Sequence, residues 1–205
     1  RQRQMCIRDR YGEKALDKLR GMFGFAVWNE KEQTLMLARD FFGIKPVYYA
    51  EIDGHFVFAS EIKSILAFPG YERKVNQKAL EQYLSFQYSP LEETFFKGIY
   101  KLMPGHMLLY KNGSYEIKTY FKPKLTPGQW DHKTNMAQLR SQLSEILKDS
   151  VKHHMLSDVE VGAFLSGGVD SGYLASSSGA DQAFTVGFDE GDRYLSLIHI
   201  SEPTR

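Results

Sequence analysis

The segment Ser166–Ser171, with the sequence SGGVDS, has the residue types of a loop that binds an anion such as phosphate. It follows the apolar run Val159–Leu165 and precedes a predicted helix that begins near Asp170. Two glycines let the backbone approach an anion closely, and the first turn of a helix directs free N–H groups at it. Ser166 and Ser171 add hydroxyl donors. The pattern therefore predicts a phosphate site, the structural alternative being a Gly-Ser turn capped by Asp170.

The residue types of the loop also indicate which kind of phosphate site it is. It has no lysine at its end, so it is not the G-x-x-x-x-G-K-[ST] loop of nucleoside triphosphatases. An acidic residue beside phosphates is favourable when a divalent cation lies between them, because Mg²⁺ binds a carboxylate together with phosphate oxygens. Asp170 is therefore the candidate ligand for Mg²⁺.

The elements that must position this loop form the opening of a strand–helix–strand unit. Apolar residues between Asn135 and His154 recur at helical spacing and predict a helix of about five turns. Val159–Leu165 and Phe184–Phe188 predict strands before and after the helix that follows the loop. This half of the chain is therefore predicted to be the start of an α/β domain.

The residues before Phe121 predict an antiparallel α+β architecture. The Asp53-Gly54 and Asn112-Gly113 dipeptides favour tight hairpin turns. The segment 122–133, with two prolines and a glycine, predicts a linker. The predicted strands are Met22–Trp28, Thr34–Ala38, Val47–Ala50, Phe56–Ala59, His106–Tyr110 and Ser114–Tyr120, and the predicted helices are Tyr11–Arg20, Ser60–Ala67 and Asn76–Ser85.

The composition excludes several classes of protein. The 205 residues include 26 Lys+Arg against 25 Asp+Glu, a balance that argues against a basic nucleic-acid binder. With 42% hydrophobic residues the chain is too apolar to remain disordered. No apolar run approaches the roughly 20 residues that a membrane-spanning helix needs. A single cysteine, Cys6, excludes an internal disulfide framework.

The two ends of the chain are interpreted as translated sequencing adapters. The leading segment is Arg1–Arg10 (RQRQMCIRDR) and the final one is Leu195–Arg205 (LSLIHISEPTR). Gln4–Arg10 and Leu195–Arg205 back-translate to transposase adapter sequence. The alternative is a basic N-terminal arm and an apolar tail. We expect residues 1–10 and 195–205 not to be native, which excludes Cys6 as a nucleophile or metal ligand. The native sequence is then a window, residues 11–194, of a longer chain.

Five segments together carry a resemblance to a known family. SGGVDS alone resembles the pyrophosphate-binding loop of the ATP pyrophosphatase group, whose members adenylate a carboxylate or carbonyl and release pyrophosphate. The five segments, which occur in the family's order, resemble the glutamine-hydrolysing asparagine synthetases. They are Arg39–Tyr49 (RDFFGIKPVYY), Phe58–Lys63 (FASEIK), Lys101–His106 (KLMPGH), Met155–Val159 (MLSDV) and Phe184–Phe188 (FTVGF).

The resemblance implies a fold and a domain division. Residues 11–121 are expected to be the C-terminal part of a glutaminase (class II glutamine amidotransferase) domain, an Ntn-type sandwich of two antiparallel sheets between helices. After the linker at 122–133, residues 134–194 are expected to begin an α/β ATP-pyrophosphatase (PP-loop) synthetase domain.

The resemblance also implies an activity. The parent enzyme is expected to make asparagine from aspartate, glutamine and ATP through a β-aspartyl-AMP intermediate, with release of AMP and pyrophosphate. The expected partners of the parent enzyme are these small molecules, and neither nucleic acid nor a membrane is expected as a partner. The expected location is the cytoplasm, and a homodimer is compatible with the family. The implied site residues are Ser166, Gly167, Gly168, Asp170 and Ser171 for the pyrophosphate end of ATP, Asp170 for Mg²⁺, and Leu165 and Val186 for the adenosine.

Some residues depart from the family pattern or stay undecided. The glutaminase cysteine and the residues that hold glutamine do not occur in 11–194, so this stretch alone is expected to have neither half-reaction. Gly172 stands where many relatives have serine. Arg39, Asp40 and Lys45 are expected to form an ion pair that fixes a turn, and the role of Glu61, in the first turn of a predicted helix, is left open.

Two alternatives to asparagine synthesis remain open at this point. One is a related amidotransferase or β-lactam-synthetase-like enzyme that acts on another carboxylate acceptor. The other is a truncated remnant without catalytic activity.

Overall fold

The computed structural model describes residues 12–124 and 135–186, which belong to two compact units. The first unit comprises Arg1–Leu125 and the second Thr126–Arg205. Both segments interpreted as adapters, and most of the predicted linker, lie outside the described residues. Within the described residues no helix is long and apolar enough to cross a membrane.

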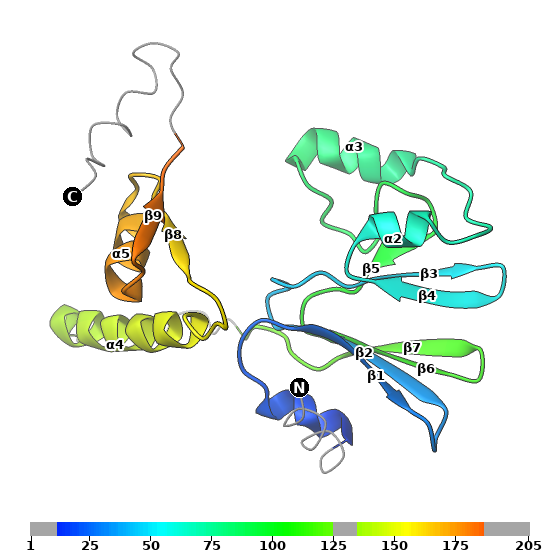
Figure 1. The fold of residues 1–205 in the computed structure, drawn as a ribbon, viewed down its shortest axis with the longest axis horizontal. Helices are drawn as coiled ribbons and strands as arrows, with labels where there is room; N and C mark the ends of the chain where they lie inside the picture. The colour runs from blue at the N-terminus through cyan, green and yellow to red at the C-terminus, as the bar shows by residue number, and fades with distance from the viewer. Residues whose placement is uncertain (1–11, 125–134, 187–205) are drawn as a thin grey trace. The chain divides into compact units, whose positions relative to one another are not determined.

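The first unit contains two antiparallel sheets (Figure 1). The strands of the first sheet, in the order β1-β2-β6-β7, are Gly24–Asn29, Thr34–Arg39, His106–Lys111 and Ser114–Thr119. The strands of the second, in the order β4-β3-β5, are His55–Ala59, Tyr48–Ile52 and Ile99–Lys101.

The hairpin turns follow the predicted chemistry. Asp53 and Gly54 have φ of 48° and 78°, and Asn112 and Gly113 have φ of 51° and 77°. Two successive left-handed residues are the geometry that joins twisted antiparallel strands with the least strain. Both hairpin predictions are therefore confirmed.

The two sheets pack face to face, with a helix on each outer face. Leu37 from β2, Leu108 from β6 and Tyr49 from β3 are at most 2% exposed and belong to the core between the sheets. Because side chains alternate along a strand, Met36 and Ala38 of β2 lie on the opposite face. There they pack against Leu16 of the 3₁₀ helix η1, Gly12–Lys18.

The outer face of the second sheet is covered in the same way. Ile65 of α2, Ile62–Leu66, is fully buried against Ala50 and Ile52 of β3. Removal of the Ile65 side chain from water contributes about 2 kcal/mol to the stability of the fold. The helix–sheet–sheet–helix order confirms the predicted sandwich of antiparallel sheets between helices.

A further helix, α3, spans Gln77–Phe86. The side chain of Asn76 accepts a hydrogen bond from the N–H of Ala79, which confirms Asn76 as the N-cap. Gln87 ends the helix in the left-handed conformation.

The second unit contains the helix α4 (Met136–His154), the strands β8 (Gly162–Phe164) and β9 (Gln182–Phe184), and the helix α5 (Val169–Ser178). Asn135 caps α4 by accepting from the N–H of Ala137 at 2.9 Å. β8 and β9 are parallel, with α5 as the connection between them. The opening of a strand–helix–strand unit is thus confirmed.

Several element boundaries were predicted wrongly. Where a helix was predicted over Tyr11–Arg20, the described residues form a seven-residue 3₁₀ helix over Gly12–Lys18. Gly12 at its start and Gly21 after its end have positive φ. β5 was not predicted because three residues are too short to show a period of two. β8 and β9 are shorter than predicted and β9 begins earlier, because the parallel ladder pairs only three residues on each strand.

Candidate functional site

The loop Ser166–Gly168 lies at the carboxyl end of β8 and leads into the N-terminus of α5. This is the position at which parallel α/β sheets bind ligands, because the strand ends and the helix start meet there. Gly167 has φ of 79°, a conformation that glycine adopts without strain. Gly168 is the N-cap, and its carbonyl accepts the N–H of Gly172 at 3.0 Å. The sequence-predicted loop therefore has the backbone geometry that an anion site needs.

The structure brings the two predicted serines of the loop together. The Oγ atoms of Ser166 and Ser171 are 3.0 Å apart. Ser171 Oγ also accepts the N–H of Ser166 at 3.2 Å and donates to the carbonyl of Gly168 at 3.0 Å. These hydrogen bonds close the loop on itself across Gly167.

Leu165 and Val186 lie at the ends of neighbouring strands. The N–H of Leu165 donates to the carbonyl of Phe184 at 2.9 Å, and Thr185 Oγ1 donates to the carbonyl of Leu165 at 2.8 Å. Leu165 thus lies beside the residue that precedes Val186, and Val186 is 68% exposed. Thr185 was not singled out from the sequence, because nothing in its type or spacing distinguishes it from other strand residues.

Asp170 is exposed in the first turn of α5, next to the loop. The described residues contain no cluster of three or more His, Cys, Asp or Glu side chains arranged to hold a metal ion. A single carboxylate beside a glycine-rich loop at a helix N-terminus instead suits an ion that takes its other ligands from phosphate and water, as Mg²⁺ does. The donor set therefore fits Mg²⁺ delivered with a nucleotide.

In the first unit, Asp40 holds the backbone of the Arg39–Tyr49 segment. It is 1% exposed, and its carboxylate accepts hydrogen bonds from the N–H groups of Phe23, Phe42, Ile44 and Lys45 at 2.8–3.3 Å. Burial alone raises the pKa of this carboxyl group, but the four backbone hydrogen bonds outweigh it and lower the pKa below its ordinary value.

Arg39 forms hydrogen bonds with backbone carbonyl groups, as Asp40 does with backbone N–H groups. Its guanidinium donates to the carbonyls of Gly43, Lys45 and Leu102 at 2.6–2.9 Å. Burial lowers the pKa of Arg39. The salt bridges within the described residues do not include Arg39 with Asp40, so the expected ion pair was wrong. The charged groups of Arg39 and Asp40 instead form hydrogen bonds with backbone groups, and these hold the turn.

Glu61 has a local role at the start of α2. It occupies the N-cap position, makes no side-chain cap hydrogen bond, and forms an exposed ion pair with Lys63. Exposed pairs of this kind contribute little to stability.

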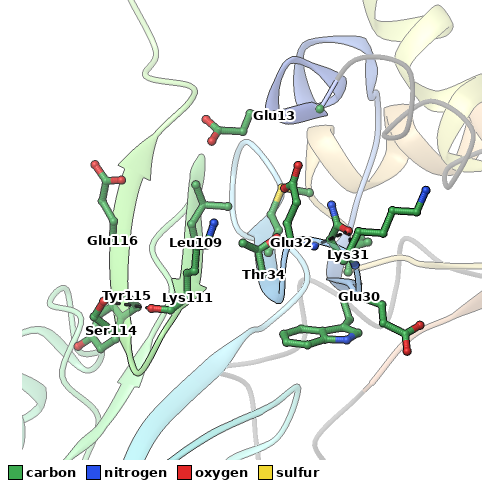
Figure 2. Close-up of a pocket in the computed structure, with 15 residues that line it drawn as sticks. Glu13, Glu30, Lys31, Glu32, Thr34, Leu109, Lys111, Ser114, Tyr115 and Glu116 are labelled. Carbon is green, nitrogen blue, oxygen red and sulfur yellow. Dashed lines mark hydrogen bonds between the residues drawn. The ribbon is translucent and has the colours of Figure 1, made fainter.

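A broad groove of about 1050 Å³ lies over the outer face of the four-stranded sheet (Figure 2). Its lining includes apolar side chains such as Leu109 and charged ones of both signs, among them Glu13, Glu32, Lys31 and Lys111. None of the predicted site residues lines this groove. The site residues predicted from the sequence instead lie in the second unit, at the loop between β8 and α5 and just beyond β9.

Gly172 provides a test of the first turn of α5. A Cβ atom at this position would meet no atom within 4 Å, and its φ is not positive. Gly172→Ala is expected to stabilise α5 by about 0.5–1 kcal/mol, because alanine loses less backbone entropy than glycine on folding. Amide hydrogen exchange in α5 measures the effect. Gly179→Ala is the matched control: Gly179 is the C-cap with φ of 65°, so the same change there should destabilise the helix. Destabilisation by Gly172→Ala would contradict the open space seen around it.

Comparison with known proteins gives two family matches in succession. Residues 5–121 match the glutamine amidotransferase domain family, and residues 142–197 match the asparagine synthase family. The first match covers more than half of the chain.

Individual relatives agree with these two family matches. The glutamine-hydrolysing asparagine synthetase 1 of Bacillus subtilis is 40% identical over 185 residues, which cover 88% of this chain and 28% of that protein. The amidase chyE of Penicillium rubens is 35% identical, with 80% and 24% covered. The chain thus spans about a quarter of the length of these relatives. A solved structure of the allosteric regulatory enzyme of purine biosynthesis is 13% identical to this chain, with a TM-score of 0.39. The alignment covers 97% of this chain and 42% of that structure's chain. This similarity is too low to support any inference.

The antiparallel sandwich, the loop between β8 and α5, and the two matches lead to one assignment. The chain belongs to the glutamine amidotransferase family, with its amidotransferase domain placed, as in the asparagine synthetases, ahead of an asparagine synthase segment.

Proposed function

We propose that this chain is part of an enzyme that makes asparagine from aspartate, glutamine and ATP. The observation that carries the proposal is the order of the two family matches, with SGGVDS located between a parallel strand and a helix N-terminus inside the second match. In the proposed reaction a carboxylate oxygen of aspartate attacks the α-phosphorus of ATP and pyrophosphate leaves. Ammonia from glutamine then attacks the β-aspartyl-AMP carbonyl, and AMP leaves with the transferred oxygen.

The loop residues Ser166, Gly167, Gly168, Asp170 and Ser171 form the proposed cradle for the leaving pyrophosphate. Free N–H groups at the start of α5, together with a hydroxyl donor, stabilise charge that grows on the pyrophosphate as the bond to the α-phosphorus breaks. They are held in place before the reaction, so little reorganisation is needed. Asp170 would hold Mg²⁺, which supplies positive charge between the phosphate oxygens.

The adenosine part of ATP is proposed to lie at Leu165 and Val186. The hydrogen bonds of Leu165 with Phe184 and Thr185 hold these two strand ends side by side. Val186 is largely exposed, so its apolar surface is free to contact a base.

The proposal also covers the domain organisation of the chain, its location in the cell and its oligomeric state. Residues 11–121 form the amidotransferase part, 122–133 a linker and 134–194 the start of the synthetase part. The parent enzyme is proposed to act on small molecules in the cytoplasm, as a homodimer.

A second candidate is amidation of another carboxylate acceptor by the same domains. The observation that favours it is that a relative of 35% identity, the amidase chyE, carries another name than asparagine synthetase. Adenylation and ammonia transfer would be shared, and only the acceptor would differ.

A chimeric enzyme tests the proposal. Residues 11–194 would replace the matching segment of the Bacillus subtilis synthetase, and glutamine hydrolysis would verify that the chimera folds. We expect the chimera to form asparagine from aspartate, glutamine and Mg-ATP at a rate within about tenfold of the unaltered enzyme. A chimera that hydrolyses glutamine but forms no asparagine would contradict the proposal.

A further inference from the structure

The tip of the hairpin between β6 and β7 differs in its chemistry from every other asparagine position of the chain. Asn112 is followed by Gly113, whereas the other three asparagines are followed by glutamate, glutamine and methionine. A backbone nitrogen that belongs to glycine reaches the amide carbon of the preceding side chain most easily, because glycine has no Cβ to obstruct the approach.

The side chain of Asn112 is also the one asparagine side chain without a structural task. Asn29 Oδ1 accepts two backbone N–H groups at 3.1 and 3.3 Å. Asn76 and Asn135 cap α3 and α4 through their side-chain oxygens. Asn112 is exposed, and its side chain forms no hydrogen bond within the part of the chain that the structure describes. Its amide group is therefore open to reaction with its neighbour and with water.

The surroundings of Gly113 leave room for a reaction but the turn itself opposes it. A Cβ atom at Gly113 would meet no atom within 4 Å. With φ of 51°, Asn112 has to rotate out of the left-handed turn before its side chain can close a ring with the next nitrogen. The tip is held by the pairing of Lys111 with Ser114 and by the Ser114 hydroxyl, which donates to the Lys111 carbonyl at 3.1 Å (Figure 2). The rate of such a reaction follows local opening of the tip, which costs little at an exposed turn.

We propose that Asn112 is a site of spontaneous deamidation. The backbone nitrogen of Gly113 forms a bond to Cγ of Asn112, and the bond from Cγ to the side-chain nitrogen breaks with its electron pair on that nitrogen. Ammonia leaves with the proton that the Gly113 N–H gives up. Water then opens the five-membered imide ring at one of its two carbonyl groups, which leaves either aspartate or isoaspartate at position 112.

The two products have different consequences for the sheet. Aspartate keeps the length of the main chain, and Asp53-Gly54 with φ of 48° and 78° shows that this dipeptide forms the same turn. Isoaspartate adds one carbon atom to the main chain and disturbs the two-residue turn that keeps Tyr110 opposite Tyr115. Since β7 is an edge strand and pairs with β6 alone, isoaspartate loosens β7 from the sheet.

The first arm of the test incubates the full 205-residue chain in H₂¹⁸O at mildly alkaline pH, followed by peptide mapping with mass spectrometry. Residue 112 is expected to take up ¹⁸O as aspartate and isoaspartate, while Asn29, Asn76 and Asn135 stay amides. The peptide KNGSY, which has no hairpin, verifies that the conditions support the reaction. Conversion of the peptide without conversion of residue 112 in the folded chain would overturn the proposal.

The second arm tests whether the structure around the turn sets the rate. Ser114→Ala removes the hydrogen bond to the Lys111 carbonyl and should speed deamidation about fivefold. Asp53→Asn places the same dipeptide in the other hairpin, where a Cβ atom at Gly70 would lie 2.1 Å from Asp53 Oδ2. Because the side chain at position 53 packs against this glycine, the new amide should convert about fivefold more slowly than Asn112. Equal rates in the two hairpins would contradict the part given to the structure.

The third arm measures the effect of the products on stability by urea unfolding. Asn112→Asp should unfold as the parent chain does. The isoaspartate fraction, separated by ion-exchange chromatography, should unfold at lower urea. An isoaspartate fraction as stable as Asn112→Asp would contradict the loosening of β7.

Discussion

Asp170→Ala in the chimeric synthetase is expected to lower aspartate-dependent pyrophosphate release by about 100-fold or more. Loss of one preorganised charge-stabilising group at a transition state has an effect of this size. Glutamine hydrolysis should be unchanged, because Asp170 lies in the second unit, outside the residues that match the amidotransferase domain. Pyrophosphate release and glutamate formation are measured on the same preparation.

Asp181→Ala is the control for this prediction. Asp181 is an exposed aspartate beyond the other end of α5, just before β9. It should leave both half-reactions close to those of the chimera. Pyrophosphate release that survives Asp170→Ala at the chimera's rate would remove Asp170 from the ATP site.

The second large effect is expected on stability, at Asp40. Its carboxylate accepts from four backbone N–H groups, so Asp40→Ala should lower the free energy of unfolding of the first unit by about 3–4 kcal/mol. Asp40→Asn should cost about 2 kcal/mol, since an amide group accepts at one atom only. Urea unfolding followed by circular dichroism measures both. Asp17→Asn, an exposed change in η1, is the control and should be nearly neutral.

The pH dependence of this contribution has a defined sign. The pKa of Asp40 is lowered in the folded state from its ordinary value of 3.8. Its stabilising effect is therefore fully present above about pH 4 and is lost as the pH falls through the lower, folded-state pKa. The difference in unfolding free energy between the parent chain and Asp40→Asn should be constant above pH 4 and shrink below it. A difference that grows towards low pH would contradict the assignment.

The sequence predicted those parts of the fold that rest on local chemistry. Asn112-Gly113 and Asp53-Gly54 favour left-handed turns between strands. Asn76 and Asn135 cap helices through contacts within three residues. β5 could not be predicted in this way, because its three residues are ordered by pairing with β3, about fifty positions earlier in the chain.

The candidate site likewise has features that could be predicted from the sequence and features that could not. The loop was recognisable because serine, two glycines, aspartate and a second serine follow one another between a predicted strand and a predicted helix. The hydrogen bonds that Ser171 forms with the N–H of Ser166 and the carbonyl of Gly168 could not be predicted, since they depend on the path of the loop backbone. Likewise, Arg39 and Asp40 are adjacent opposite charges, and only the backbone path of residues 42–45 shows that each binds main-chain groups instead.

The most direct test of the proposed chemistry is to follow the oxygen atoms of aspartate. The chimera would be incubated with glutamine, Mg-ATP and aspartate labelled with ¹⁸O in its side-chain carboxylate, and the products analysed by mass spectrometry. Adenylation of aspartate predicts one ¹⁸O in AMP, unlabelled pyrophosphate, and asparagine that keeps the other. Label in inorganic phosphate with formation of ADP would show attack on the γ-phosphorus. That result would contradict the role proposed for SGGVDS as the cradle of a leaving pyrophosphate.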